Sequence, residues 1–543
     1  MVSVLQARTE IPPIDWNPGS DWINVKDHGV VGDGAADDTA ALQSIFSQLS
    51  PGGVIYFPPG EYRVTDELLL EKSQEGNSRE KRLMGIGLNG HGSKSVIRYD
   101  GAPGGVMLRI RGVLHYRMEG LVFDGANKAR VGMYHDNRLS DGMRFETHLY
   151  HRYITMRDFT EYGILFGDLD DNPGGASAET AFEHMIFENC GAGITFNKFN
   201  DYNFTFDGCI FRDNNRVAVE CINGNFYVRN SRFENNALDV YANPEHSSSI
   251  RRTVSVGSGS FLSFVNSVSP FTVENCLVVD WKNDAAITAT GAPMLIFDNH
   301  FDSAGEKPAV ISAASGQQIV YTGNTTKGAT NLFGRKSDTY VTTQLVERSP
   351  IMLIKDMDFM PDLVEVPGRH FDVKEGFGAI GDGKADDTAA IQAAIDAARR
   401  HGDNAIAYLP HGEYRITKPL RLEGGGYIFG GGTVYSELHF DGDPDDDAVV
   451  VAPEGKLTLE TFRVKRSALE IRREDRDEGW RVRTYKVGIF EGKGADIRQL
   501  PSSGGSQVEY HTVYVTGKYL ELPFHLGLRF DGLRKHDTVL LQN

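Results

Sequence analysis

One twelve-residue phrase stands twice in this chain, and no other feature of the sequence constrains the fold as much. Residues 32–43 read GDGAADDTAALQ and residues 381–392 read GDGKADDTAAIQ. Each copy follows a short strand-like segment and leads into a run with apolar residues at helical spacing, such as Leu42, Ile45 and Leu49. A strand, a turn with proline and glycine, and a second strand come next. We therefore expect two units that begin with the same strand–loop–helix element.

The phrase itself is predicted to be structural. Asp or Thr before a helix satisfies a free backbone N–H, and an acid there suits the helix dipole. A calcium loop would need alternating ligands and a closing glutamate. A phosphate loop would need Lys followed by Ser or Thr, and a dinucleotide loop a third glycine. The phrase lacks all of these, so we interpret it as the start of a domain.

The phrase, with the Gly-Glu-Tyr-Arg that follows at 60–63 and 412–415, resembles the opening of pectate-lyase-3-type proteins. In that superfamily the short helix covers the open N-terminal end of the β-helix, where core and strand edges would otherwise be exposed. Two copies in one chain are similar to the layout of family 55 glycoside hydrolases, which act exo on β-1,3-glucan. The resemblance implies an all-β fold, a right-handed parallel β-helix in two tandem units, each opened by a strand–loop–helix cap.

Short apolar strands followed by a polar pair recur between the two copies, as stacked coils of about 20–30 residues require. Examples are FTFDG at 204–208 and FYVRN at 226–230. Most intervals are 22 to 26 residues; one of 45 is interpreted as two coils and one of 38 as a coil with an insertion. Coils stack about 4.8 Å apart. Equivalent residues are therefore expected to form one outer column: Glu119, Arg157, Glu183, Asp207, Arg229, Glu274, Asp298 and Thr322.

This spacing predicts an N-terminal extension over residues 1–21, a first β-helix unit over 22–345, a linker over 346–370 and a shorter second unit over 371–543. The coils of the second unit are hard to follow beyond its opening. Family 55 enzymes have a longer second helix, so the chain departs from that pattern here.

Charge and composition narrow the partners. The net charge of −18 argues against nucleic acid and anionic membranes as partners. The sequence contains no run of about 18 apolar residues, so we predict no membrane helix. The chain shows no basic segment followed by an apolar run at its start, which leaves a cytoplasmic, virion-associated or secreted and processed protein open. The four cysteines form no Cys-x-x-Cys pair and are expected in the core: Cys190, Cys209, Cys221 and Cys276.

The predicted column borders the groove in which right-handed β-helix enzymes hold their substrate. Its acids and their neighbours are the candidate catalytic residues: Glu183, Asp207, Asp158, Glu274 and Asp298. Cations and imidazoles on the column and in an inserted loop are the candidate substrate-binding residues: Arg157, His184, Arg229, His135, His148 and His151. Glycoside hydrolysis needs two carboxyl groups, about 5–5.5 Å apart for retention and about 6.5–9.5 Å for inversion. Adjacent coils would bring Glu183 and Asp207, or Glu274 and Asp298, to about 5 Å.

We expect a carbohydrate-active enzyme, a glycoside hydrolase of the β-glucan type without metal or cofactor, as a monomer or homotrimer. One alternative is a polysaccharide lyase on a uronate polymer, with Ca²⁺ held by Asp170 and Asp171. An unsaturated product would distinguish the lyase. Another alternative is a trimeric glycan-binding protein similar to phage tailspikes, which oligomer size would distinguish.

Overall fold

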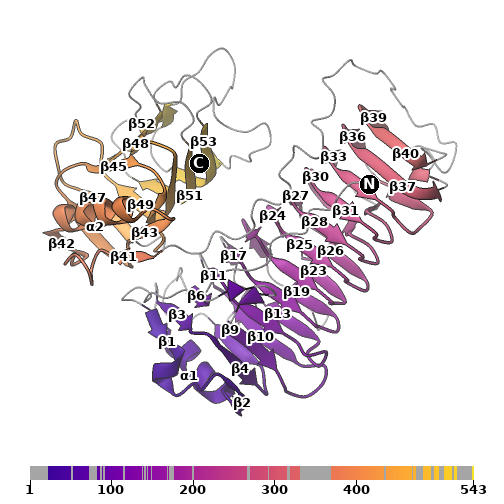
Figure 1. The fold of residues 1–543 in the computed structure, drawn as a ribbon, viewed down its shortest axis with the longest axis horizontal. Coiled ribbons are helices and arrows are strands. Elements are labelled where there is room, and N and C mark those ends of the chain that lie inside the picture. Colours follow the sequence, from indigo (N-terminus) through magenta and orange to yellow (C-terminus); the bar gives the residue numbers. More distant parts are fainter. Residues whose placement is uncertain are drawn as a thin grey trace. The chain divides into compact units, whose positions relative to one another are not determined.

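The computed structural model in Figure 1 describes residues 22–329 and 369–542, apart from short gaps. The chain divides into two compact units, one with each copy of the repeated phrase. The predicted domain boundaries stay predictions, because residues 1–21 and 330–368 are not among those described. The gaps are residues 50–52, 72–81, 86–87, 90–91, 94, 114–115, 137, 140–141, 144, 148, 168, 170–175, 199–200, 266–268, 292, 308, 315–317, 433–435, 468, 472–480, 491–494, 500–506, 516–518 and 522–540.

The first unit is a stack of coils whose strands form three long parallel sheets (Figure 1). Sheet A holds β1 (Trp22–Asn24), β3 (Val54–Phe57), β6 (Arg82–Gly85), β11 (Arg117–Glu119), β17 (Tyr150–Arg152), β21 (Ala181–Glu183), β24 (Phe204–Asp207), β27 (Phe226–Arg229), β30 (Ser248–Arg251), β33 (Phe271–Glu274), β36 (Met294–Phe297) and β39 (Ile319–Thr322). Sheet B holds β2 (Asp33–Asp37), β4 (Gly60–Val64), β9 (Ser95–Tyr99), β12 (Val122–Asp124), β18 (Thr155–Arg157), β22 (Ile186–Glu188), β25 (Ile210–Arg212), β28 (Arg232–Glu234), β31 (Val254–Val256), β34 (Leu277–Val279), β37 (His300–Lys307) and β40 (Thr325–Ala329). Sheet C holds β5 (Leu68–Glu71), β10 (Val106–Arg111), β13 (Val131–His135), β19 (Tyr162–Phe166), β23 (Ala192–Phe196), β26 (Val217–Cys221), β29 (Val240–Ala242), β32 (Leu262–Val265), β35 (Ala285–Thr290) and β38 (Ala309–Ala313).

Shorter elements accompany these sheets. The 3₁₀ helix η1 (Val25–His28) and the helix α1 (Thr39–Gln48) belong to the cap. Two antiparallel pairs, β7 (Leu88–Asn89) with β8 (Gly92–Ser93) and β14 (Arg138–Leu139) with β15 (Gly142–Met143), lie in connections. A parallel pair, β16 (Phe145–Thr147) with β20 (Ala176–Ala178), lies in the connections from sheet C to sheet A.

From β11 to β38, each coil passes from sheet A to sheet B through a two-residue turn and then continues to sheet C. The first residue of the turn from A to B has a positive φ, for example 65° at Gly208, 49° at Asn230 and 53° at Asn275. Gly and Asn tolerate this left-handed conformation better than other residues do. At Gly208 the lack of a side chain also matters, because a Cβ there would lie 2.5 Å from Nδ1 of His184. The polar pair seen in the sequence therefore marks the corner of the coil.

The interior of the first unit is apolar and stacked along the coils. Phe187, Phe211 and Phe233 form one stack, with ring centroids 4.8 and 4.9 Å apart. The four cysteines are buried and free, as expected. Burial raises the pKa of Cys190 and of Cys276 to about 12, so these thiols stay protonated and inert near neutral pH.

Identical hydrogen bonds tie the loop and helix of the repeated phrase together in both units. Asp38 accepts from the backbone N–H groups of Val31 and Gly32 at 2.7 and 3.0 Å, and Asp387 does the same in the second copy at the same distances. Neither acid makes a side-chain bond to its helix, so the expected helix-capping role is wrong for them. In the first copy Asp37 takes this role instead, because its carboxylate accepts a hydrogen bond from the backbone N–H of Thr39, the first residue of the helix, at 3.1 Å.

We expect Asp38→Ala to destabilise the first unit by about 1.5–3 kcal/mol, because the side chain is buried and its loss leaves two N–H groups unpaired. Urea unfolding of the full chain measures this. Asp33→Ala is the matched control: Asp33 also accepts two backbone bonds, but it is exposed and water replaces it. Equal losses in the two variants would contradict the buried role of Asp38.

The second unit opens in the same way and continues as a β-helix-like stack. Its cap is β41 (His370–Asp372), β42 (Asp382–Asp386) and α2 (Thr388–His401). One sheet of coil strands contains β45 (Leu420–Gly424), β48 (Val449–Pro453), β50 (Leu469–Ile471), β52 (Ala495–Gln499) and β54 (Tyr519–Glu521). The other contains β43 (Ala405–Tyr408), β44 (Gly412–Ile416), β46 (Tyr427–Gly430), β47 (Ser436–Phe440), β49 (Lys456–Lys465), β51 (Arg481–Phe490), β53 (Gln507–Val515) and β55 (Leu541–Gln542).

The long strand β49 explains why these coils were hard to follow in the sequence. Its first half pairs with β46 and its second half with β47, so two faces of the coil join in one bent strand. Thr461, with φ of 50°, lies between the halves. The two-residue corner that marks each coil of the first unit is therefore missing here. Neither described helix has the length and apolar character needed to cross a membrane.

Candidate functional site

A column of charged residues runs along the outer face of sheet A. The register pairs each residue with the next, from one coil to its neighbour. We call this set the charged column: Glu119, Arg152, Glu183, Asp207, Arg229, Arg251 and Glu274. The alternation of buried and partly exposed positions along β24 and β27 shows that Asp207 and Arg229 point away from the core. Glu119, Arg152 and Glu183 share their register and are buried, with Glu183 8% exposed.

The order of charges in this column differs from that on sheet B. From Arg98 onward the outer column of sheet B alternates in sign, although Arg63 of the preceding coil stands beside Arg98: Arg98, Asp124, Arg157, Glu188, Arg212 and Glu234. Neighbours of opposite sign attract across a sheet and like charges repel, so that alternation is what stability alone favours. The charged column instead contains two pairs of like-charged neighbours. One pair is the acids Glu183 and Asp207, and the other is the cations Arg229 and Arg251.

The two neighbouring acids have different partners. Asp207 forms an ion pair with Arg229 at 3.0 Å and accepts a hydrogen bond from Asn230 at 2.7 Å. Glu183 accepts a hydrogen bond from the hydroxyl of Tyr150 at 2.6 Å. Among the described residues, no cation lies within ion-pair distance of Glu183. One carboxylate is thus fixed by a cation, and the other is held by a neutral phenol.

His184 follows Glu183 directly, at the corner between sheets A and B, with φ of 51°. Its ring stacks on that of Tyr153, with centroids 5.3 Å apart and planes 8° from parallel. Both rings border the charged column. The predicted neighbourhood of Glu183, Asp207, Arg229 and His184 is therefore present in the fold, and the roles of these residues stay predictions.

Two residues assigned to the column from the sequence lie on sheet B or in the turn that follows it. Arg157 belongs to β18 of sheet B and pairs with Asp124 at 2.7 Å. Asp158 follows it in the turn toward sheet C. Because sheets A and B face different directions, neither side chain joins Glu183. The residue of that coil that does belong to the column is Arg152, which the sequence alignment missed.

The second predicted acid pair is also not formed. Glu274 stands opposite Phe297, and Asp298 occupies the corner that follows, with φ of 54°. Arg251 fills the coil that the double interval of 45 residues implied, and it pairs with Glu274 at 3.6 Å. The midpoint of that interval was the signal that could have identified Arg251.

The histidines of the inserted loop are placed in strands rather than in a loop. His135 ends β13 and stacks on Phe166, and His151 lies in β17 and stacks on Phe182. Both are fully buried, so the expected loop position is wrong and neither side chain offers a surface for substrate contact. His148 lies outside the described residues, as do Asp170 and Asp171 of the predicted calcium site.

These buried histidines belong to a polar cluster inside the coil. Nδ1 of His135 lies 2.8 Å from Oε2 of Glu146, and the Tyr116 hydroxyl contacts Nε2 of His151. Burial lowers the pKa of His135 to about 3 and raises that of Glu146 well above its ordinary value. Burial thus favours the uncharged form of both groups, which costs less in a core.

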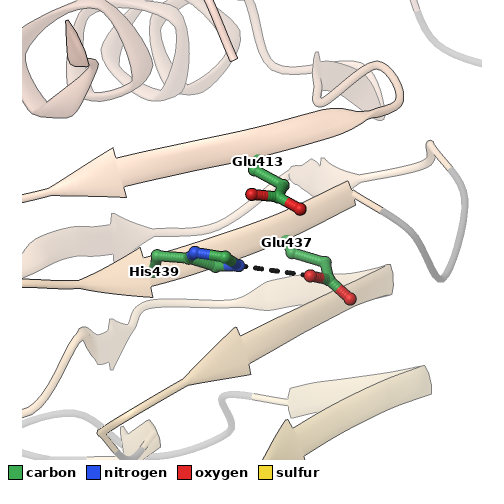
Figure 2. Close-up of side chains that lie close together, drawn as sticks. All are labelled: Glu413, Glu437 and His439. Atoms are coloured by element: carbon green, nitrogen blue, oxygen red, sulfur yellow. Dashed lines mark hydrogen bonds and ion pairs between the residues drawn. The ribbon is translucent and has the colours of Figure 1, made fainter. Parts of the chain in front are cut away.

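The second unit carries one group of described residues whose atoms are close enough to share a metal ion: Glu413, Glu437 and His439. Figure 2 shows Nε2 of His439 directed at Glu437, at 3.2 Å, with Glu413 on the neighbouring strand. Glu437 is also bound by Nζ of Lys465 at 2.5 Å and by Arg463 at 3.2 Å. Two cations already neutralise this carboxylate, so we interpret the group as an ion-pair network.

We expect this network to stabilise the second unit at neutral pH and to fail in acid. Burial acts to raise the pKa of Glu437, but hydrogen bonds from Lys465 and His439 outweigh it and hold that pKa below its ordinary value. The unfolded chain then binds a proton at higher pH than the folded one, so stability falls as pH drops through and below the ordinary glutamate range, near 4.3. Comparing the chain with Glu437→Gln by urea unfolding at several pH values checks this. A stability difference that stays constant down to pH 3 would contradict it.

A groove of about 540 Å³ lies against the second cap, between α2 and the residues that follow β44. Its polar lining serves the cap itself. Gln392 bonds both backbone groups of Arg421, and Asp386 accepts from Thr417 at 2.7 Å. Gln43 and Asp37 make the same bonds in the first cap, so this groove gives no indication of a ligand.

Two family models match parts of the chain. The family described as rhamnogalacturonase A/epimerase, pectate lyase-like, matches residues 22–101 and 371–465, which include both caps. The right-handed β-helix region matches residues 156–331, the coils of the first unit. The chain has a pectate-lyase-like right-handed β-helix fold. The resemblance identified from the repeated phrase is thereby confirmed, and the family 55 layout stays a prediction.

Curated relatives of this β-helix protein match it over short stretches. Mannuronan C5-epimerase AlgE3 of Azotobacter vinelandii is 52% identical over 69 residues, which are 11% of this chain and 4% of the relative. Rhamnogalacturonase A of Emericella nidulans is 25% identical over 174 residues, 32% of this chain and 29% of the relative. The chain thus matches less than a third of either relative. The A-module of epimerase AlgE4 of Azotobacter vinelandii has a TM-score of 0.42 at 13% identity, over 59% of this chain and all of that one.

Proposed function

We propose that this protein is a carbohydrate-active enzyme, a glycoside hydrolase that cleaves a polysaccharide on the outer face of sheet A. The observation that supports this is the in-register pair of acids, Glu183 and Asp207, on neighbouring strands. Neighbouring strands lie about 4.8 Å apart. Carboxyl groups about 5–5.5 Å apart are what a retaining glycosidase uses. The names of the relatives, which include rhamnogalacturonase and alginate lyase, support a polysaccharide as substrate.

The contacts of the two acids suggest their roles. Asp207, fixed by Arg229 and Asn230, is the nucleophile, because an ion pair keeps its oxygens as a carboxylate. Glu183 is the proton donor. Asp207 would form a bond to the anomeric carbon while Glu183 protonates the departing glycosidic oxygen, so that the bond from carbon to oxygen breaks. Water, deprotonated by Glu183, would then release the sugar from Asp207.

A polysaccharide lyase on a uronate polymer is the second candidate. The neighbouring cations Arg229 and Arg251 favour it, because two positive charges one coil apart suit a carboxylate on the substrate. In a lyase these cations would neutralise the uronate while a base removes the proton beside it. The bond to the glycosidic oxygen would break, leaving one fragment with a double bond and the other with a new hydroxyl group.

A panel of polysaccharides tests both candidates at once. Laminarin and other neutral glucans stand beside rhamnogalacturonan, pectate and alginate, with reducing ends and near-ultraviolet absorbance measured together. New reducing ends without absorbance support the hydrolase. Absorbance on a uronate polymer would replace it with the lyase. The absence of cleavage on all of them would count against an enzyme of either class.

A further inference from the structure

A second outward column of sheet A lies beside the charged column and carries no charge over eight consecutive coils. Its residues stand two positions before those of the charged column, or of its continuation, in each strand: Tyr150, Ala181, Thr205, Tyr227, Ser249, Thr272, Leu295 and Val320. Two of these residues are aromatic: the hydroxyl of Tyr150 is bonded to Glu183, and the other is Tyr227. It stands opposite Thr205 in the register, on the strand next to the one that carries Asp207. A polymer lying along the coils over the acids would therefore also cover Tyr227.

The hydroxyl of Tyr227 is oriented by a chain of side-chain amides. Nδ2 of Asn225 donates to the Tyr227 oxygen at 2.9 Å and to Oδ1 of Asn203 at 3.3 Å. Nδ2 of Asn203 donates in turn to Oε1 of Glu179 at 2.8 Å. An amide NH₂ group can only donate, so the Tyr227 oxygen is the acceptor in its bond. Its own hydrogen must point away from Asn225, and no acceptor for it is found among the described residues.

Glu179 ends this chain of hydrogen bonds as an acid without a cation. No Lys, Arg or His of the described part of the chain lies within ion-pair distance of it. Burial raises the pKa of Glu179, although the bond from Asn203 acts in the opposite direction. A partly buried acid bound only by an amide is a poor source of stability. The arrangement is better explained by the direction it imposes on Asn203, Asn225 and Tyr227.

We propose that Tyr227 is a substrate-contacting residue whose hydroxyl donates a hydrogen bond to a sugar oxygen, with Asn225, Asn203 and Glu179 as positioning residues. This inference rests on the proposed function, since it places the polymer on the same face of sheet A. It names a neutral oxygen as the group recognised, a hydroxyl or ring oxygen of the sugar unit beside the one held at the two acids. The contact requires no charge on that unit.

Retention of the full chain in gels that contain each polysaccharide of the panel tests the contact, with KM measured wherever cleavage occurs. We expect Tyr227→Phe to weaken retention and raise KM by up to about tenfold, the loss of one neutral hydrogen bond. Tyr241→Phe is the matched control, because Tyr241 is a half-buried tyrosine on the outer face of sheet C. It should change neither quantity.

Asn225→Asp tests the orientation with little change of shape. An ionised Asp accepts rather than donates, so Tyr227 would turn its hydrogen toward it and lose its contact with the sugar. We expect this variant to match Tyr227→Phe and to add nothing to it in the double variant. Additive losses would overturn the positioning role of Asn225. Thermal unfolding of each variant shows whether the coil remains folded, and Asn203→Gly is the alternative if Asn225→Asp unfolds it.

The outcomes separate this inference from the proposed function. Cleavage and retention that Tyr227→Phe leaves unchanged would overturn the inference and leave the hydrolase standing. Retention without cleavage, lost in Tyr227→Phe, would support the sugar contact and overturn the enzyme. Neither cleavage nor retention on any polymer would overturn both.

Discussion

Glu183→Gln and Asp207→Asn are each expected to lower kcat by a factor of about 10²–10⁴, the contribution of a positioned acid, base or nucleophile. Each amide keeps the size of the side chain but can neither donate the proton nor attack the anomeric carbon. Because both acids act in the same reaction, the double variant should be little worse than either single one. Initial rates of reducing-end formation, on whichever polymer the panel identifies, measure the effect.

The control for this pair is Glu188→Gln. Glu188 lies in the same coil as Glu183, but on sheet B, where it pairs with Arg212 in the alternating column. The Glu188→Gln variant should be slightly less stable to unfolding than the unchanged chain and should keep the same turnover. Glu183→Gln or Asp207→Asn with unchanged turnover would remove that acid from the mechanism. Equal loss of turnover in Glu188→Gln would show that the coil, rather than the site, had been damaged.

The cap could be predicted from the sequence because its residues act locally. Loop, helix and following strand lie within about forty residues, and Asp37, Asp38 and Thr39 bond only within that segment. What the sequence did not reveal was the direction of Asp38, which faces the loop before the helix. An acid before a helix has two sets of free N–H groups within reach, and only the path of the loop decides between them.

The charged column could be predicted only in part, because strand periodicity is short. Successive side chains of a strand alternate between two faces, so an error of one residue moves a side chain to the opposite face. Asp298 was misplaced by one residue from Phe297, and it lies in the corner after the strand rather than on the face of sheet A. The coil with Arg152 and Arg157 carries two similar strands five residues apart, on sheets A and B, and an apolar–polar pattern fits both.

The buried histidines could not be predicted for a different reason. His135 and His151 read as polar residues in a charged segment, which is typical of an exposed loop. They are buried because Glu146 and Tyr116 supply partners inside the coil. Partners of this kind come from other coils and from the insertion, so no local sequence pattern predicts them. Where polar residues form hydrogen bonds with one another across coils, the polar composition of a segment wrongly predicts that its side chains are exposed.

Phe211→Ala is expected to destabilise the first unit by about 3–5 kcal/mol, the cost of emptying a buried aromatic site. The ring is fully buried and stacks between Phe187 and Phe233, at interplanar angles of 3° and 17°. Both neighbours lose a partner at once, and neither can move far because each belongs to its own coil. In a stacked-coil protein the destabilisation stays near the substituted residue, because each coil contacts only its neighbours.

Hydrogen exchange should therefore become faster mainly between residues 186 and 234, and less so toward either end of the unit. Thr205→Ala, on the outer face of the same coil, is the control and should leave the exchange pattern unchanged. Uniform quickening over the whole unit would show instead that its coils unfold as one cooperative body.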